Sequence, residues 1–317
     1  MNALTTGILL TTLIPMTAAW SPLHQDDPEP TATIEFGDPV KLHDGFQFTE
    51  GPTPDADGNV YFTDIPNERI HVHTVAGELK TFLTGSKKCN GLAFDGSGRL
   101  WACQGGEGRV VRIDVETKEI TPVADRMDGG PFLSTNDLAL DAHGGAYFTD
   151  PAYWRHPDSR VNEGVYYVNE GGRITRLVEG LLRPNGILLS PDGATLYLLP
   201  MGEKRLIAYD VIAPGRIGPA RNLADLPAGG DGLTCDTEGV LYLTQPRLRS
   251  IVAYSPEGKR LGSVKLRRSP SNVCFGGPGL DHLYVTAGDG FYRIAVNRRG
   301  LGPGSVGAGR QVAEPSE

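Results

Sequence analysis

The stretch Asn136-Asp137-Leu138-Ala139-Leu140-Asp141-Ala142-His143-Gly144-Gly145-Ala146-Tyr147-Phe148-Thr149-Asp150 determines how the rest of the chain is interpreted. A short apolar run follows its polar start, the Asp-Ala-His-Gly segment marks a turn, and Ala-Tyr-Phe-Thr forms a second run of strand-favouring residues. Two such runs around an Asp/Gly turn predict a β-hairpin.

The hairpin pattern of residues 136–150 occurs five more times along the chain. The six copies begin at Glu50, Asn90, Asn136, Asn185, Asp231 and Asn272, and successive starts are 40, 46, 49, 46 and 41 residues apart. Repeats of about 40–50 residues that each hold several strands are typical of β-propellers. Six copies therefore predict an all-β, six-bladed β-propeller.

Each hairpin is followed by a third run rich in β-branched and aromatic residues, and most are followed by a fourth, more polar run. Polar outer strands suit the edges of blades, where charge and proline discourage pairing with other sheets. The sixth repeat has no good fourth run, whereas Pro39-Val40-Lys41-Leu42 precedes the first hairpin and has no blade of its own. We therefore expect four-stranded blades, with this N-terminal strand completing the sixth blade and closing the ring.

The repeat also predicts the domain organisation. Residues 38–296 form one propeller, residues 20–37 resemble a polar linker, and residues 297–317 are expected to be a flexible C-terminal tail. Residues 1–19 contain an apolar run that ends in Thr17-Ala18-Ala19, a pattern that predicts a signal peptide and an exported protein, periplasmic or secreted. The apolar run is too short to cross a bilayer as a helix, so we expect no membrane association after its removal.

Composition excludes some classes of partner. The formal net charge of −8 argues against nucleic-acid binding, which needs a basic surface. The four cysteines show no CxxC spacing and hence no zinc signature. Four buried free thiols are the favoured interpretation, and a Cys89–Cys103 disulfide remains an alternative. We expect a monomer that binds a small molecule.

The first position of each repeat is polar in all six copies, although an apolar strand follows at once. If these residues open the innermost strands, they form a ring at one mouth of the central channel. Glu50 and Asp231 are its two carboxylates, and Asn136 and Asn185 add amide oxygens. Four hard oxygen donors with a charge of −2 suit Ca²⁺. The alternative interpretation, favoured for Asn90 and Asn272, is that polar residues here only satisfy backbone groups and hydrate the channel.

Further residues are expected at the same mouth. The second strand of each hairpin runs back toward the ring, so its last residues lie close to the first residues of the hairpin. This places Asp64, Gln104, Asp150 and Gln245 near the ring, with Tyr153 just beyond, as candidates for substrate binding. The six histidines outside residues 1–37 show no partner at the mouth and are interpreted as structural or solvated.

Several segments resemble the regucalcin/gluconolactonase family in order and spacing across residues 38–296. They include Glu50-Gly51-Pro52, Asn136-Asp137, Arg183-Pro184-Asn185-Gly186-Ile187 and Asp231-Gly232-Leu233. The resemblance implies one catalytic divalent cation held by Glu50, Asn185 and Asp231, with Asn136 contacting metal-bound water or substrate. Ser134 stands where animal members have an arginine implicated in sugar-lactone binding. The predicted export resembles bacterial gluconolactonases.

These observations together predict metal-dependent hydrolysis of a lactone, such as the sugar lactone glucono-δ-lactone. Ca²⁺ is the favoured cation, with Mg²⁺, Mn²⁺ or Zn²⁺ as alternatives, and Asp231 is expected to act as the general base as well as a ligand. Two alternatives use the same propeller. One is a calcium-dependent phosphotriesterase-like hydrolase, and the other is a non-catalytic secreted propeller in which a cation only stabilises the channel.

Overall fold

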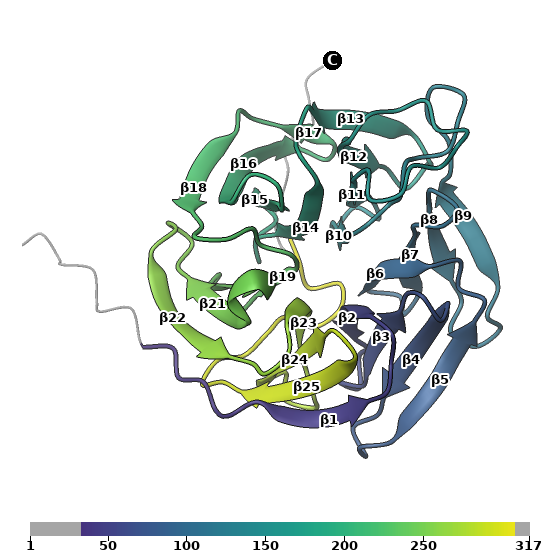
Figure 1. Ribbon diagram of the computed structural model, residues 1–317. Coiled ribbons are helices and arrows are strands. Elements are labelled where there is room, and N and C mark those ends of the chain that lie inside the picture. Colours follow the sequence, from purple (N-terminus) through teal and green to yellow (C-terminus); the bar gives the residue numbers. More distant parts are fainter. Residues whose placement is uncertain (1–32, 308–317) are drawn as a thin grey trace, which may run out of the picture. The chain divides into compact units, whose positions relative to one another are not determined.

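The computed structural model describes residues 33–307. The predicted signal peptide and residues 20–32 of the predicted linker lie outside the described residues. Within them, six antiparallel sheets surround a central axis as the blades of a β-propeller (Figure 1). The predicted fold class is confirmed. No helix in the described part of the chain is long and apolar enough to span a bilayer.

The blades follow one another along the chain. Blade 1 holds β2 (Thr49–Pro54), β3 (Val60–Asp64), β4 (Arg69–His73) and β5 (Leu79–Thr84). Blade 2 holds β6 (Cys89–Phe94), β7 (Leu100–Gln104), β8 (Arg109–Ile113) and β9 (Ile120–Ala124). Blade 3 holds β10 (Leu138–Leu140), β11 (Ala146–Asp150), β12 (Gly164–Val168) and β13 (Ile174–Glu179).

The second half of the chain repeats this order. Blade 4 holds β14 (Pro184–Leu189), β15 (Thr195–Pro200), β16 (Arg205–Ala213) and β18 (Arg221–Asp225), with the short β17 (Arg216–Ile217) added to β16. Blade 5 holds β19 (Leu233–Cys235), β20 (Leu241–Gln245), β21 (Ser250–Tyr254) and β22 (Arg260–Lys265), and a 3-10 helix, η1 (Pro246–Leu248), follows β20. Blade 6 holds β23 (Pro270–Gly276), β24 (His282–Ala287), β25 (Gly290–Ala295) and β1 (Val40–Asp44).

The ring is closed by the strand predicted to close it. β1 pairs antiparallel with β25, with Val40 opposite Arg293 and Asp44 opposite Gly290. The N-terminal and C-terminal parts of the propeller thus share one sheet. Unfolding either end would break the hydrogen bonds of this sheet.

The first strand of every blade faces the channel. β2, β6, β10, β14, β19 and β23 contact one another in a closed cycle. The hydrophobic core lies between neighbouring blades, where large side chains interlock. Phe132, for example, packs edge-to-face against both Phe148 and Tyr166 of blade 3, with ring centroids 5.0 Å apart. This packing fixes the first strands, and with them every residue at the channel mouth.

Two segments predicted to be loosely held are part of the packed propeller. Ile34 is buried against blades 5 and 6, and Phe36 forms a β-bridge with Val296. The linker prediction is therefore wrong for residues 33–37. At the other end, residues 297–307 lie across the channel on the face of the hairpin turns. The backbone N–H of Gly300 donates a hydrogen bond to the carbonyl of Leu280, and that of Gly307 donates one to the carbonyl of Pro191. The prediction of a flexible tail is thus also wrong for these residues, while residues 308–317 lie outside the described part.

A histidine pair connects the closing strand to blade 1. His43 Nε2 in β1 and His73 Nδ1 in β4 are 2.9 Å apart, beside the ring of Phe291. Burial lowers the pKa of His43, and burial together with His43 lowers the pKa of His73 to about 4. The His73 ring is therefore neutral in the folded protein near pH 6, and His43 is less readily protonated than unfolded histidine, which has a pKa near 6.5. The contact is structural, as expected for these histidines.

The pair predicts a loss of stability in acid. Below pH 6.5 the unfolded chain takes up protons that the folded chain does not. The stability that the histidine pair contributes is therefore complete above pH 6.5 and is lost as the pH falls toward 4. We expect a loss of about 1–2 kcal/mol over this range, because both rings remain partly hydrated. Thermal unfolding of His73→Gln should show a shallower decline in Tm than the wild type. His143→Gln, in an exposed turn, should keep the wild-type slope, and equal slopes in all three proteins would contradict the assignment.

Candidate active site in the central channel

The six residues that open the repeats form the predicted ring at one end of the channel. Glu50, Asn90, Asn185 and Asn272 lie within their first strands, whereas Asn136 and Asp231 lie two residues before theirs. Each is at most 7% exposed. Backbone hydrogen bonds join adjacent members: the N–H of Gly91 donates to the carbonyl of Asn136, and the N–H of Gly186 donates to that of Asp231. The ring is therefore held by the backbone.

Glycine after the ring position permits this close approach. The residues that follow the six ring members are Gly51, Gly91, Asp137, Gly186, Gly232 and Val273. A Cβ atom on Gly51 would lie 2.1 Å from the carbonyl oxygen of Asn90, and one on Gly186 would lie 2.3 Å from that of Asp231. Four first strands thus lack a side chain at the position where they touch the next blade.

Asp137 is the exception in this second layer and is the residue that sequence reasoning missed. Its carboxylate lies beside Gly91, accepts a hydrogen bond from the N–H of Leu138 and is hydrogen-bonded by Asn272. The channel therefore contains three carboxylates instead of two. The sequence did contain a signal: among the six residues that directly follow the ring members, Asp137 is the single charged one, and the others are glycine or valine.

The three carboxylates lie close to one another: Glu50 and Asp231 are buried, and Asp137 is half-buried. Burial raises the pKa of Glu50 to about 8, with the charge of Asp137 adding to the effect. Burial also raises the pKa of Asp137 to about 7. The pKa of Asp231 is raised well above its usual range, first by burial and then by the charges of Glu50 and Asp137. Three negative charges cannot coexist here without a compensating cation or bound protons.

Two asparagines bind these carboxylates directly. The Asn272 side chain hydrogen-bonds to Glu50 and to Asp137, and its Oδ1 accepts the N–H of Val273 at 2.8 Å. Asn272 therefore satisfies a backbone group, as the sequence analysis favoured for this residue. It also positions two carboxylates. Asn185 hydrogen-bonds to Asp231 and donates from Nδ2 to the Tyr153 hydroxyl at 2.6 Å. Tyr153 thus reaches the ring from the loop between β11 and β12.

The other predicted substrate-binding residues are buried and hydrogen-bonded to the backbone. Asp64 accepts the N–H groups of Gln47 and Phe48, and Asp150 accepts those of Leu133 and Ser134. Gln104 donates to the Ser86 carbonyl, and Gln245 donates to that of Ala228. Each side chain fastens the segment that leads into the ring residue of its own blade. These four residues position the ring and do not line the mouth.

This arrangement predicts a positioning role for Asp150. In Asp150→Asn only one oxygen can accept the two N–H groups of Leu133 and Ser134, so the segment before Asn136 should shift. We expect kcat/KM for a cleaved lactone to fall about 10- to 100-fold, with KM rising and a smaller change in Tm. Asp150→Glu should recover part of the activity, because it keeps both acceptor oxygens. Unchanged kinetics in Asp150→Asn would exclude the role.

The donor set determines which cation the channel could hold. Within residues 33–307, no three His, Cys, Asp or Glu side chains converge closely enough to hold a metal ion by themselves. A cation here would need amide oxygens besides the carboxylates of Glu50 and Asp231, and Asn136 and Asn185 stand beside them in the ring. Carboxylate and amide oxygens are ligands for hard cations such as Ca²⁺ and Mg²⁺. The residues present therefore fit a divalent cation with oxygen ligands.

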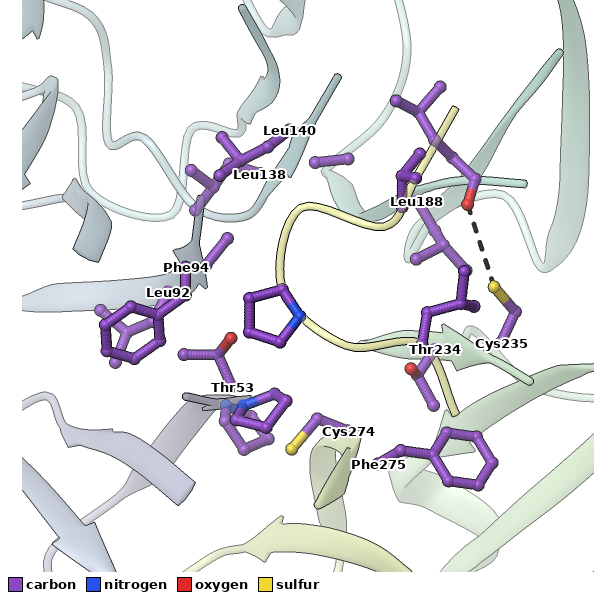
Figure 2. A pocket seen from close by; sticks show the side chains of 18 of the residues that line it. Thr53, Leu92, Phe94, Leu138, Leu140, Leu188, Thr234, Cys235, Cys274 and Phe275 are labelled. Carbon is purple, nitrogen blue, oxygen red and sulfur yellow. Dashed lines mark hydrogen bonds between the residues drawn. The ribbon is translucent and has the colours of Figure 1, made fainter. Parts of the chain in front are cut away.

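Below the ring the channel widens into a cavity of about 190 Å³. First-strand residues such as Thr53, Leu138 and Cys274 line it, and the C-terminal segment crosses it with Pro303 and Val306 (Figure 2). The four cysteines are free and buried, in agreement with the favoured prediction. The C-terminal segment therefore lies at the end of the channel opposite the ring.

The fold and this mouth define the class of the protein: a six-bladed propeller with a carboxylate–amide site in its channel. Residues 48–289 match the model of the SMP-30/gluconolactonase/LRE-like region, and the chain belongs to this family. It is 27% identical to the gluconolactonase of Zymomonas mobilis over 86% of this chain and 85% of that protein. It is 26% identical to the pentonolactonase of Haloferax volcanii, over 76% and 81% of the two chains. The structure of a gluconolactonase from Xanthomonas campestris superposes with a TM-score of 0.75 at 25% identity, covering 81% and 89%.

Proposed function

We propose that the protein hydrolyses a lactone at the channel mouth, with a sugar lactone such as glucono-δ-lactone as the substrate. The observation that carries the proposal is the convergence of Glu50, Asp231, Asn136 and Asn185 at one end of the channel. Relatives that cleave sugar lactones match over most of both chains, which supports hydrolysis of a cyclic ester. We also propose that the protein is exported, on the basis of residues 1–19.

One divalent cation, Ca²⁺ in the first instance, would be held by Glu50, Asn185 and Asp231, with Asn136 beside it. When bound, it would supply charge that polarises the lactone carbonyl and lowers the pKa of a nearby water. The raised pKa values of the buried carboxylates give this proposal its electrostatic basis, because a cation removes the repulsion that burial imposes.

The protein residues supply the proton transfer and the orientation. We assign to Asp231 the removal of the proton of the attacking water, because its carboxylate stands in the ring beside Asn185, which holds Tyr153 at the mouth. Asn185 and Tyr153 form one wall of the mouth and offer hydrogen bonds to substrate hydroxyls. Asp64 and Asp150 hold the approaching segments and need not touch the substrate.

The test is hydrolysis of glucono-δ-lactone, followed by pH-stat. Protein stripped with EDTA should be inactive and should recover activity when Ca²⁺, Mg²⁺, Mn²⁺ or Zn²⁺ is added back. The same preparations would be offered a phosphotriester. Cleavage of the phosphotriester alone would replace the proposal with the phosphotriesterase-like alternative, and stabilisation by metal without any cleavage would favour a binding module.

A further inference from the structure

We call the position two residues before each ring member the rim position of the mouth. It is occupied by Phe48, Lys88, Ser134, Arg183, Gly229 and Pro270. Lys88 and Arg183 are the two charged members, and they belong to blades 2 and 4. The first strands of these blades, β6 and β14, both contact β10 of blade 3. The positively charged side chains of Lys88 and Arg183 therefore flank blade 3 from either side.

Both positively charged side chains stand over aromatic rings of the loop between β11 and β12. Lys88 Nζ lies 5.7 Å from the ring centroid of Trp154, and Arg183 Cζ lies 6.0 Å from that of Tyr153. The indole N–H of Trp154 donates to the carbonyl of Gly105, which fixes that ring. Cation–π contacts of this kind hold a long side chain in place without neutralising its charge. Both charges therefore remain available at the mouth.

The backbone at both positions is held in an unfavourable conformation. Lys88 has φ of 54° and Arg183 has φ of 53°, in the left-handed region that costs residues other than glycine about 1–2 kcal/mol. The carbonyl of Lys88 accepts the N–H of Gly105, and that of Arg183 accepts the N–H of Met201. Such strain is retained where the surroundings impose it, and it occurs most often at functional sites.

Neither cation is neutralised by a neighbouring acid. Within residues 33–307, Lys88 and Arg183 form no ion pair, whereas the adjacent Lys87 approaches Glu107 at 3.9 Å. Both side chains are exposed. Deeper in the channel lie the carboxylates of Glu50, Asp137 and Asp231, whose charge bound protons or a cation must offset. The exposed positive charge of the mouth is thus carried by Lys88 and Arg183.

We propose that the substrate carries an anionic group in addition to its lactone ring, and that Lys88 and Arg183 bind this group at the rim. This inference rests on the proposed function, because it names the class of lactone. A carboxylate, sulfonate or phosphate offers oxygens to the guanidinium of Arg183 and to the ammonium of Lys88. The charge distribution orients the substrate, with the anionic group outward and the uncharged lactone carbonyl toward the ring. Lys88 and Arg183 are specificity residues here and take no part in bond breaking.

The experiment compares two lactones that share a ring. Glucaro-1,4-lactone carries a carboxylate where glucono-1,4-lactone carries a hydroxymethyl group. We expect the wild type to favour the anionic lactone by at least about 10-fold in kcat/KM, and Lys88→Gln and Arg183→Gln each to lower this ratio about 5- to 10-fold, mainly through KM. The preference should also weaken as salt is raised. Lys204→Gln is the matched control, because Lys204 is also exposed with φ of 51° but stands over no aromatic ring of residues 33–307.

A binding measurement separates this inference from the proposed function. Titration calorimetry with glucarate and with gluconate should show tighter binding of the dianion, lost in the Lys88→Gln/Arg183→Gln double variant. If both lactones are cleaved with equal kcat/KM and the double variant is unchanged, the anion site is overturned while the lactonase stands. If no lactone is cleaved, the proposed function fails. In that case glucarate binding that needs both cations would still support the site, and binding that ignores them would reject it.

Discussion

Asp231→Asn is expected to lower kcat/KM for the cleaved lactone by about 10³-fold or more, because it removes the proposed base and one charged ligand together. The fold should survive the change. Asp231 is buried among other carboxylates that raise its pKa, so the neutral amide relieves repulsion in the metal-free protein. We expect the Tm of the EDTA-treated variant to equal or exceed that of the EDTA-treated wild type.

The matched control for this variant lies in the same blade. Asp236 is fully buried at the opposite face, where it accepts the N–H groups of Glu238 and Val240 and the hydroxyl of Tyr242. Asp236→Asn should lower the Tm and leave kcat/KM of the folded protein near the wild-type value. The two variants thus separate catalysis from stability. Full activity in Asp231→Asn would remove this residue from the mechanism.

Removal of the divalent cation is the second change with a large expected effect. EDTA should abolish lactone hydrolysis and lower the Tm, since Glu50, Asp137 and Asp231 then repel one another in a buried space. A cation present at about 100 times its Kd stabilises a protein by roughly 2.7 kcal/mol, and for a propeller of this size we therefore expect a fall in Tm of about 5 °C. Differential scanning calorimetry with and without metal measures this shift.

Glu50→Gln provides the site-specific version of that experiment. It removes one anionic ligand and should reduce the metal-induced rise in Tm to less than about half of the wild-type value, together with loss of activity. Glu119→Gln, at an exposed position outside the channel, should retain the full rise. A Tm rise that is the same in Glu50→Gln as in the wild type would locate the cation elsewhere.

Much of the fold could be predicted because a propeller repeats one local unit. Each hairpin carries its own turn residues and strand-forming runs, so neighbours in sequence are neighbours in space. The closing strand was predictable for a related reason: β1 was a strand without a blade, and the sixth repeat lacked its last strand. The packing of residues 33–37 and 297–307 was not predictable, because glycine-rich and polar segments carry no periodic pattern.

The candidate site divides in the same way. The ring of Glu50, Asn136, Asn185 and Asp231 follows from the column of polar residues that open the repeats. Asp64 and Asp150 hold the segments that lead into Glu50 and Asn136, and their partners are backbone N–H groups, which no sequence pattern identifies. Asp137 was missed because alternation along one strand cannot show which side chains several strands bring into the same small volume.

By itself, the sequence determined the repeat, the number of blades and the column of polar residues, because each follows from a local hairpin pattern that recurs along the chain. Only the tertiary structure decided the electrostatics of the mouth. Glu50, Asp137 and Asp231 come from three different blades, as do Lys88, Trp154 and Arg183. The shifted pKa values of these carboxylates depend on burial and on charges in other blades. They therefore arise only when the six blades have closed around the channel.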